Sequence, residues 1–455
     1  MSREDLLFGS LFDSCPETWD IVHFEEAIDF QEGPGIMAVD FHDTGVPLIR
    51  LSGVQRSTAS LDGCNFLDPE KVAKKWNHFR LKCGDLLIST SATIGMVSEV
   101  GPDTEGSVAY TGLIRLRPRT DKVWPGFIKH FASSSFFIQQ AEGMAAGSVL
   151  RHFGPSHLRQ MAFPIPPLAE QKAIAAVLGK LDDKIELNRR MNSTLEAIAR
   201  ALFKSWFVDF DPVRAKIDGC KPIGLDETTA SLFPDKFQDS KLGQIPRGWE
   251  IGTLGSILDV LETGRRPKGG VGSFTSGVPS VGAESINGIG VFDYSKTKYI
   301  PFEFYDKTSS GRIAHFDVLL YKDGGKPGEF RPRVGLFGHD FPFKTFCINE
   351  HVFRMRSVRT GQSFLFFTTS HQRVLDDFAN TGGKAAIPGI NQPDVKSTPI
   401  VLPPKEITDA FNARADILCD QILHNAKQSR TLALLRDTLR PKLLSGELIA
   451  ANLQS

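Results

Sequence analysis

The sequence contains few cysteines, and none of the spacings that would tie them to a structural metal or to a disulfide framework. Its 455 residues include six cysteines, and no two of them form a CxxC pair. A zinc ribbon or a disulfide-stapled domain is therefore not expected. The pattern is typical of a reducing compartment.

The chain also lacks the hydrophobic segments that would direct it to a membrane. Its polar start, MSREDL, does not resemble a signal peptide, and no apolar run approaches the roughly 20 residues that span a bilayer. We therefore expect a soluble, cytoplasmic protein with no membrane partner. Lys plus Arg and Asp plus Glu number 53 each. This balance excludes a polycationic tail but allows local basic patches for nucleic acid.

Motifs for catalysis are missing as well. The segment GGKPG at 324–328 lacks the spacing and the Ser or Thr of a Walker A loop. The Pro-Pro pairs at 166–167 and 403–404 do not supply the Asn/Asp-Pro-Pro-aromatic tetrad of an adenine methyltransferase. A nuclease-like match, Asp235 with the Asp-Ser-Lys at 239–241, has too few intervening residues to bridge two strands. We expect no catalytic residue and no metal site.

The sequence does contain an internal repeat with a period of about 235 residues. The motif PETWDI at 16–21 returns as PRGWEI at 246–251. Further along, FPIPPL at 163–168 returns as IVLPPK at 400–405. The chain is therefore predicted to fold as two copies of one architecture, with a few loop insertions in the second copy.

Between these motifs, each copy has short apolar runs broken by Gly, Pro, Asn and Asp. Examples are VPLIRL at 46–51 and TGLIRLR at 111–117. Such runs are typical of short strands joined by long loops. We predict an α+β protein with two β-rich α/β domains in tandem, at 1–165 and 246–402. The segment 211–245, rich in Pro, Gly and charge, is predicted to be a linker.

A different pattern follows each Pro-Pro motif. Residues 166–210 and 403–455 carry apolar side chains at alternating spacings of three and four, which is typical of a long, coiled-coil-like helix. Asn188 and Asn425 share one register position, and a buried Asn in such a seam sets the pairing register. We predict that the helices pair antiparallel as a spacer between the domains. Packing of each helix on its own domain stays an alternative.

The ends and the seam of these helices can be stated by residue number. Pro212 and Pro441 are predicted to end the first and the second helix, because proline interrupts helical hydrogen bonding. The predicted seam contains Ile174, Leu178, Leu181, Ile185, Asn188, Leu195, Leu202, Phe411, Leu418, Ile422, Asn425, Leu432 and Leu439.

Several predicted loops combine glycine with lysine or arginine. Glycine allows close backbone approach, and Arg or Lys supplies phosphate contacts or a bidentate contact to guanine. Any surface loop can carry such residues, but here glycine loops recur at corresponding places, 89–95 and 322–328. They predict that the two copies read different DNA sequences. The candidate DNA-contacting residues are Thr90, Thr93, Arg151, Arg265, Arg266, Lys322, Lys326, Arg331 and Arg333.

Taken together, these motifs resemble the specificity (S) subunits of type I restriction-modification systems. FPIPPLAEQKAI at 163–174 is similar to the start of the family's first conserved helix. LFKSWFVDFDPV at 202–213 and the segment 232–250 are also similar to family motifs. LRPKLLSGEL at 439–448 resembles the family's C-terminal motif, whereas Pro-Lys-Glu at 404–406 departs from the pattern because it lacks the Glu-Gln pair.

The resemblance implies two target-recognition domains that each read one half of an asymmetric, bipartite site in double-stranded DNA, in defence against foreign DNA. It implies that the helices dock two methylation (M) subunits, which restriction (R) subunits then join. S-adenosylmethionine would be held by the M subunits, and ATP and Mg by the R subunits, so this chain would hold no cofactor and catalyse nothing. The alternatives are a coiled-coil scaffold without DNA readout and a self-contained methyltransferase or nuclease.

Overall fold

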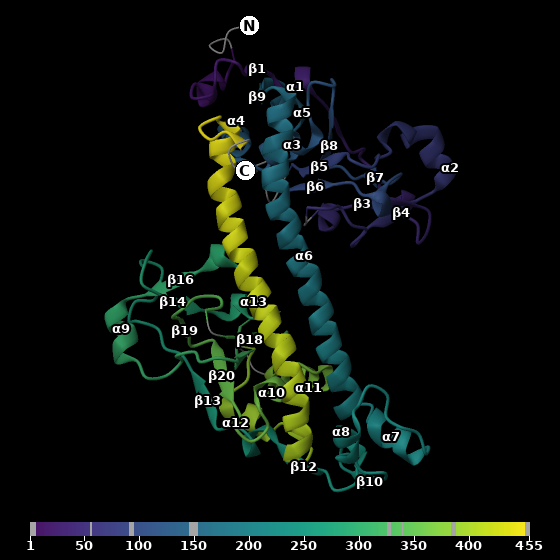
Figure 1. The fold of residues 1–455 in the computed structure, drawn as a ribbon, viewed down its shortest axis with the longest axis vertical. Coiled ribbons are helices and arrows are strands. Elements are labelled where there is room, and N and C mark those ends of the chain that lie inside the picture. The colour runs from purple at the N-terminus through teal and green to yellow at the C-terminus, as the bar shows by residue number, and fades with distance from the viewer. Residues whose placement is uncertain are drawn as a thin grey trace. The chain divides into compact units, whose positions relative to one another are not determined.

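The chain divides into two compact units in the computed structural model (Figure 1). Unit 1 consists of Met1–Glu186 with Thr431–Ser455, and unit 2 of Leu187–Arg430. Each unit therefore takes part of both long helices, α6 (Leu168–Phe207) and α13 (Lys405–Leu444). The structure describes residues 6–54, 57–90, 95–144, 153–324, 329–338, 340–383 and 388–450.

The domain of unit 1 is built on a four-stranded sheet of order β2-β8-β5-β6 and a three-stranded sheet of order β4-β3-β7, while β1 pairs with β9. Its elements are β1 (Asp20–His23), α1 (Phe24–Ala27), β2 (Ile28–Glu32), β3 (Val46–Ile49), β4 (Asn65–Leu67), α2 (Pro69–Lys71), β5 (Leu86–Ser89), β6 (Val97–Glu99), β7 (Val108–Ala109), β8 (Leu113–Pro118), α3 (Pro125–Ala132), α4 (Ser135–Met144), α5 (Pro155–Gln160) and β9 (Ala162–Ile165).

Aromatic side chains dominate the core of unit 1. The rings of Phe131 and Phe163 pack edge to face with their centroids 4.9 Å apart, and the rings of Phe24 and Phe163 do so with centroids 5.8 Å apart. Edge-to-face contacts are a favoured geometry for aromatic pairs and add to the gain from burying the rings. Ile174 and Leu178 of α6 are fully buried in this core, so the start of α6 is anchored in the domain.

The domain of unit 2 has a five-stranded sheet of order β13-β20-β17-β18-β15 and a three-stranded sheet of order β16-β14-β19, while β12 pairs with β21. Its remaining elements are α7 (Asp211–Ile217), α8 (Glu227–Ser231), β10 (Phe237–Ser240), β11 (Gly243–Pro246), β12 (Glu250–Thr253), β13 (Val260–Thr263), β14 (Val278–Val281), β15 (Gly288–Ile289), β16 (Lys298–Ile300), α9 (Phe302–Lys307), β17 (Asp317–Tyr321), β18 (Val334–Phe337), β19 (Cys347–Ile348), β20 (Val352–Arg356), α10 (Gln362–Thr369), α11 (Gln372–Gly382), α12 (Gln392–Ser397) and β21 (Pro399–Leu402).

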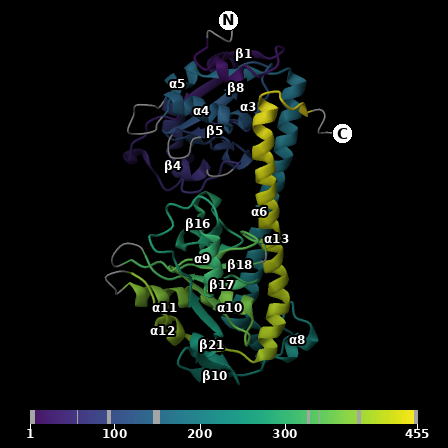
Figure 2. The same cartoon turned by 90° about the vertical axis from the view of Figure 1, so that its left-hand side faces the viewer.

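The two domains repeat one topology. The order β2-β8-β5-β6 in unit 1 corresponds to β13-β20-β17-β18 in unit 2, and the three-stranded sheets also match, each with one antiparallel and one parallel pair. In unit 2, α10 packs on β17 and β18, α11 packs on α10, and α12 packs on α11 (Figure 2). The predicted α+β class with two β-rich domains is confirmed.

The long helices pair antiparallel within each unit. In unit 1, Asp182 of α6 accepts a hydrogen bond of 2.7 Å from Arg436 of α13. In unit 2, the Asn188 side chain donates to the Gln428 side chain at 2.8 Å, and Asn425 donates to Asn192 at 2.9 Å. All thirteen predicted seam positions are buried or half-buried. Both predicted asparagines therefore lie between the helices and fix their register by hydrogen bonds.

The predicted end of the second helix is wrong. The helix α13 continues through Pro441 to Leu444. Proline removes one backbone donor, but Leu443 and Leu444 are fully buried in the core of unit 1, and this apolar burial stabilises the last turn. The first helix ends at Phe207, and Pro212 lies in the first turn of α7, where proline is well tolerated.

The segment 211–245, predicted to be a linker, is folded against unit 2. It contains α7, α8 and the strand β10, which forms an antiparallel hairpin with β11. Phe233 and Ile245 are buried in the core of the unit, and Phe237 packs against that core. Its aromatic residues, rather than its many polar ones, decide how this segment folds.

Within the described ranges, no helix is both long and apolar enough to cross a membrane.

Candidate nucleic-acid interface

One edge of the five-stranded sheet in unit 2 collects the loops that carry most predicted DNA-contacting residues. Arg265 and Arg266 follow β13, Lys322 follows β17, and Arg333 precedes β18. Both β13 and β17 run antiparallel to β20, and β18 runs antiparallel to β17. The ends of β13 and β17 and the starts of β18 and β20 therefore meet at the same edge, which we call the loop edge of unit 2.

Charges at the loop edge of unit 2 form a network of ion pairs. The Arg266 Nε atom lies 3.0 Å from Glu350, and Lys322 lies 3.0 Å from Asp323. His351 contacts both acids, with its Nδ1 atom 2.5 Å from Asp323 and its Nε2 atom 3.4 Å from Glu350. The basic groups here are held in place by neighbouring carboxylates, and part of their charge is neutralised locally.

The remaining arginines of this edge differ in how they are held. The Arg333 guanidinium stacks on the Tyr321 ring at 5.0 Å and donates to the Ala283 carbonyl at 2.9 Å. Arg331 pairs with Glu329, and its side chain is 84% exposed. Arg265 is exposed and has no hydrogen bond or ion pair among the described residues. Arg265 and Arg331 can therefore reach a ligand in solvent, whereas Arg333 braces the loop.

The predicted residues of the first copy are placed differently. Thr90 follows β5 and is fully buried, and its hydroxyl donates to the Gly112 carbonyl at 3.1 Å. Its role as a DNA contact stays a prediction, although its hydroxyl already has a partner. Thr93 and Arg151, together with Lys326 of the second copy, lie outside the described residues.

Unit 1 contains a basic residue that the sequence patterns do not indicate. Arg50, directly after β3, stacks on the Tyr110 ring at 4.4 Å and donates to the Asn65 side chain at 2.6 Å. Stacked arginines are preorganised for phosphate or base contacts. Arg50 ends the strand-like run VPLIR and has no glycine beside it, so it does not match the pattern of a basic glycine loop.

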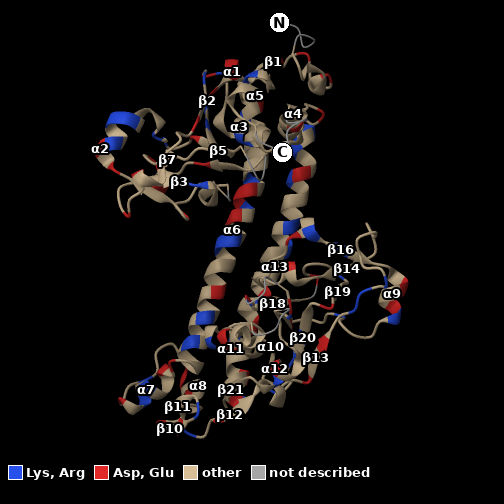
Figure 3. Ribbon diagram, turned by 180° about the vertical axis from the view of Figure 1, so that it is seen from behind, with Lys and Arg blue, Asp and Glu red and all other residues tan. Residues whose placement is uncertain are grey.

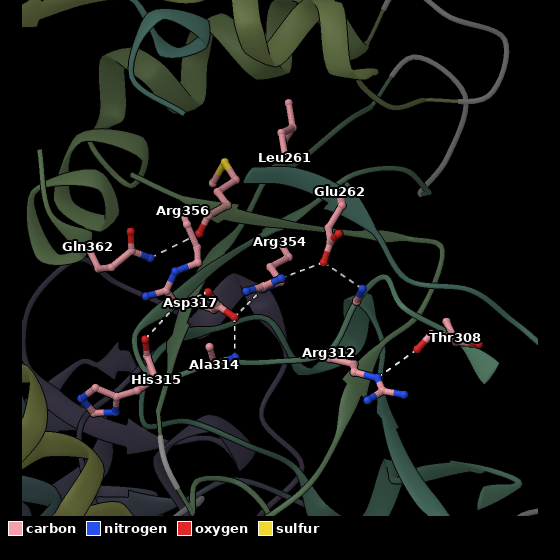
Figure 4. Close-up of polar contacts among 12 residues, drawn as sticks. Leu261, Glu262, Thr308, Arg312, Ala314, His315, Asp317, Arg354, Arg356 and Gln362 are labelled. Carbon is pink, nitrogen blue, oxygen red and sulfur yellow. Dashed lines mark hydrogen bonds and ion pairs between the residues drawn. The ribbon is translucent and has the colours of Figure 1, made fainter. Parts of the chain in front are cut away.

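A buried aspartate with arginine partners supports the sheet of unit 2 (Figure 4). Asp317 is fully buried at the start of β17, and it accepts hydrogen bonds from Arg354 at 2.5 Å and Arg356 at 2.6 Å, both on β20. It also accepts from the backbone N–H of Ala314 at 2.6 Å. These contacts hold β17 against β20 at the end opposite to the loop edge.

Unit 1 repeats this arrangement. Asp85 precedes β5, and Arg117 on β8 donates two hydrogen bonds of 2.6 Å to its two carboxylate oxygens. The hydrogen bonds to Asp85 raise the pKa of the Arg117 guanidinium. The sequence contains a signal for this pair, because Gly-Asp-Leu-Leu at 84–87 and Phe-Asp-Val-Leu at 316–319 share the aspartate, but neither aspartate lies in a basic glycine loop.

Basic and acidic side chains are interspersed over the chain. Along α6, Lys and Arg are mixed with Asp and Glu (Figure 3). Among the described residues, no three His, Cys, Asp or Glu side chains are grouped so as to hold a metal ion. Local groups such as the loop edge of unit 2, rather than the net charge, are therefore the places to look for a nucleic-acid contact.

Comparison with known proteins identifies the class to which this fold belongs. Residues 16–197 match the family model described as the Type I restriction modification DNA specificity domain. The chain shares 25% identity over 391 residues with the MjaIX specificity subunit of Methanocaldococcus jannaschii, covering 83% of this chain and 81% of that one. It shares 26% identity over 428 residues with the HindI specificity subunit of Haemophilus influenzae, covering 81% and 87%.

A solved structure has the same fold. The crystal structure of the S subunit of a type I restriction-modification system from M. genitalium matches with a TM-score of 0.53 at 12% identity, covering 95% of this chain and 96% of that chain. Residues 16–197 therefore match a type I restriction-modification DNA specificity domain, and over most of its length the chain is similar to specificity subunits of such systems. The curated relatives named above are specificity subunits of type I restriction enzymes.

Proposed function

We propose that this chain reads an asymmetric, bipartite site in double-stranded DNA for a type I restriction-modification complex, with one half read by each domain. The observation that carries this proposal is the pair of domains with one topology and different residues directly after the corresponding strands β5 and β17. The paired helices, which contribute to both units, would set the gap between the two half-sites.

The correspondence between the domains rests on matching hydrogen bonds. The N–H of Thr90 donates to the Gly112 carbonyl at 3.0 Å, and the N–H of Lys322 donates to the His351 carbonyl at 2.9 Å. Thr90 therefore corresponds to Lys322, and Gly112 to His351. Thr90 and Gly112 in one copy are replaced by Lys322 and His351 in the other, which supports two different half-sites, because base edges are distinguished by the donors and acceptors that face them.

The partners that we propose are two M subunits, and R subunits that join through the assembled methyltransferase. In unit 2, Leu187, Met191 and Ile198 of α6 are 49%, 37% and 50% exposed. Their spacing of four and seven residues places them on one face of the helix. This apolar stripe is suited to an M subunit, and Leu434 and Leu435 of α13 in unit 1, 49% and 46% exposed, are candidates for the second. S-adenosylmethionine would then reside in the M subunits, and ATP and Mg in the R subunits.

An exchange of domains tests the proposal. Residues 246–402 are replaced by the corresponding domain of a relative, and the DNA sequence methylated by the complex is mapped. We expect one half of the methylated site to change and the other half to be kept. A coiled-coil scaffold without DNA readout predicts the same target before and after the exchange, and this result would refute DNA reading by the second domain.

A further inference from the structure

Three neutral side chains of unit 1 fix the guanidinium of Arg50. It lies 4.4 Å from the centroid of the Tyr110 ring and 5.7 Å from that of the Phe41 ring, and its Nη1 atom donates to the Asn65 side chain at 2.6 Å. The two rings pack edge to face with centroids 6.3 Å apart. No carboxylate among the described residues pairs with Arg50. Its plane is therefore fixed, while its positive charge is not neutralised.

This group lies close to a predicted DNA contact of the first domain. Arg50 directly follows β3 and Tyr110 directly follows β7, and these two strands run parallel. Residues 110–112 lead into β8, and β5 ends beside the start of β8 because the two strands are antiparallel. Thr90, which follows β5, donates to the Gly112 carbonyl at 3.1 Å. The Arg50 stack is therefore at the end of the domain where β5 ends and β8 begins.

The second copy has no arginine at this position. The parallel pair β3–β7 corresponds to the parallel pair β14–β19. In each pair, the residue after the second strand donates its N–H to the last carbonyl of the first strand at 3.0 Å, from Tyr110 to Ile49 and from Asn349 to Val281. Arg50 therefore corresponds to Gly282. A stacked arginine in only one copy is expected of a residue that gives one domain its own half-site.

The chemistry of this group favours a base over a phosphate. The bond to Asn65 uses an N–H of Nη1, and no hydrogen bond to a described residue uses the Nε and Nη2 donors. These two donors form a fork, and guanine presents the O6 and N7 acceptors side by side in the major groove. That contact requires the guanidinium to lie in the plane of the base, so a fixed plane favours it. A phosphate, with oxygens that point in several directions, does not require a fixed plane.

We propose that Arg50 is the residue through which the first domain reads a guanine in its half-site. Its Nε and Nη2 atoms donate to O6 and N7 of the base, while Asn65 and the two aromatic rings position the guanidinium. The inference rests on the proposed function, because it requires the first domain to contact the major groove. The domain exchange described above identifies the half-site concerned, which is the one kept when residues 246–402 are replaced.

The test removes one acceptor atom from the DNA. The full chain, assembled with its M subunit, is titrated with duplexes in which each guanine of this half-site, on either strand, is replaced in turn by 7-deazaguanine, which lacks N7. Fluorescence anisotropy measures the affinity. We expect one of these replacements to weaken binding by the wild-type complex about tenfold, the loss for one hydrogen bond from a charged donor.

A variant of the arginine shows whether this loss passes through Arg50. Arg50→Met keeps an apolar stem between the rings and removes the donors, so it should weaken target binding by more than about tenfold. The 7-deazaguanine replacement should then cause no further loss. Arg50→Gln is a second variant without the guanidinium and is tested in the same way. Base changes in the other half-site should still weaken both variants, which shows that the complex is folded and reads DNA.

Arg119→Met is the matched control. Arg119 directly follows β8, at the end of that strand away from Arg50, and its side chain is 53% exposed. This variant should keep the wild-type affinity and the effect of 7-deazaguanine.

Several results would overturn the reading of guanine by Arg50. They are a half-site without a G·C pair, a wild-type complex that no 7-deazaguanine weakens, and variants of Arg50 that keep the effect of 7-deazaguanine. Equal weakening of target and shuffled duplexes by Arg50→Met would show a phosphate contact instead and would also overturn it. In each case the proposed function stands as long as the target is bipartite, whereas a complex without a bipartite target overturns the proposed function itself.

Discussion

At the loop edge of unit 2, arginines from similar sequence contexts differ in whether their hydrogen-bond donors are already used within the protein. Arg265 is exposed and unpaired among the described residues, whereas Arg333 stacks on Tyr321 and donates to Ala283. The donors of Arg333 are used within the protein, so this side chain positions its loop, whereas the donors of Arg265 are open to a ligand. Charge and glycine content predicted all of these arginines alike, because neither property tells a braced side chain from an open one.

Arg265→Ala is expected to weaken specific DNA binding. If Arg265 reads a base, the loss is about 1–3 kcal/mol and one position of the target relaxes, and if it binds phosphate, all sequences weaken alike and the salt dependence becomes less steep. Fluorescence anisotropy with target and shuffled duplexes at several salt concentrations distinguishes the two. Lys221→Ala is the control, since Lys221 is 89% exposed and lies in the segment 211–245. Equal affinities of Arg265→Ala and Lys221→Ala would remove Arg265 from the interface.

Asp317→Ala is expected to destabilise unit 2 strongly. It leaves Arg354 and Arg356, with side chains only 15% and 29% exposed, without their shared buried partner. Breaking a buried ion pair from one side costs about 3–5 kcal/mol. The midpoint of chemical unfolding measures the loss. The control Asp409→Ala breaks a surface pair with Lys405 and should change stability by less than about 1 kcal/mol. Similar midpoints for both variants would contradict the structural role of Asp317.

Unit 1 is expected to lose stability in mild acid. His130 is 3% exposed, and burial, partly opposed by Asp182, lowers its pKa to about 4. The unfolded chain binds a proton near pH 6.5 and the folded chain does not, so the contribution of His130 is present above pH 6.5 and is lost as the pH falls towards 4. Its full size is on the order of 3 kcal/mol. The measurement is the unfolding temperature as a function of pH. His130→Gln should make this temperature fall less steeply between pH 6.5 and 4, whereas His424→Gln, at an exposed position of α13, should leave the slope as it is.

At the scale of the element, two neighbouring residues of α13 differ in their burial against the other long helix. Leu418 is half-buried in the seam, and Ile417 beside it is 70% exposed. Leu418→Asp should lower the free energy of unfolding by about 2–4 kcal/mol, because it places a charge against apolar side chains. Ile417→Asp should change it by less than about 0.5 kcal/mol. Equal effects in urea titrations would mean that the helices do not pair along the predicted seam.

The exposed stripe of α6 allows a similar comparison for assembly. Met191→Asp places a charge in the proposed docking surface for an M subunit, and Ser193→Asp places it two residues away at another exposed position. We expect Met191→Asp to weaken binding of the M subunit at least tenfold and Ser193→Asp to leave it almost unchanged. Size-exclusion chromatography and surface plasmon resonance measure the difference. Wild-type affinity for Met191→Asp would place the M subunit elsewhere.

The sequence predicted the long elements better than their ends. Apolar spacing placed Asn188 and Asn425 correctly between the helices, since a pattern over many turns averages out local exceptions. It misplaced the end at Pro441, because a local rule about proline does not see Leu443 and Leu444 buried in a core formed by residues hundreds of positions earlier. The local patterns also did not indicate the Asp317 ion pairs, because β17 and β20 are neighbours in the sheet but are separated along the chain by β18 and β19.

At the scale of the whole molecule, duplication would explain how one chain reads the asymmetric site that we propose. Two domains with one topology keep the buried aspartates Asp85 and Asp317 and the paired strands around them. The residues directly after the matching strands differ, with Thr90 after β5 where Lys322 stands after β17. The repeat itself was readable from the sequence, but the correspondence of single residues required the hydrogen bonds of the sheets.

The most direct test of the account is to map the DNA sequence that this chain selects. The chain is co-expressed with its M subunit in a host that lacks adenine methylation, and N6-methyladenine is located by long-read sequencing. We predict methylation at a motif with two different half-sites separated by a gap of fixed length. A single continuous motif, or a palindromic one, would contradict the central claim that the two domains read two different halves.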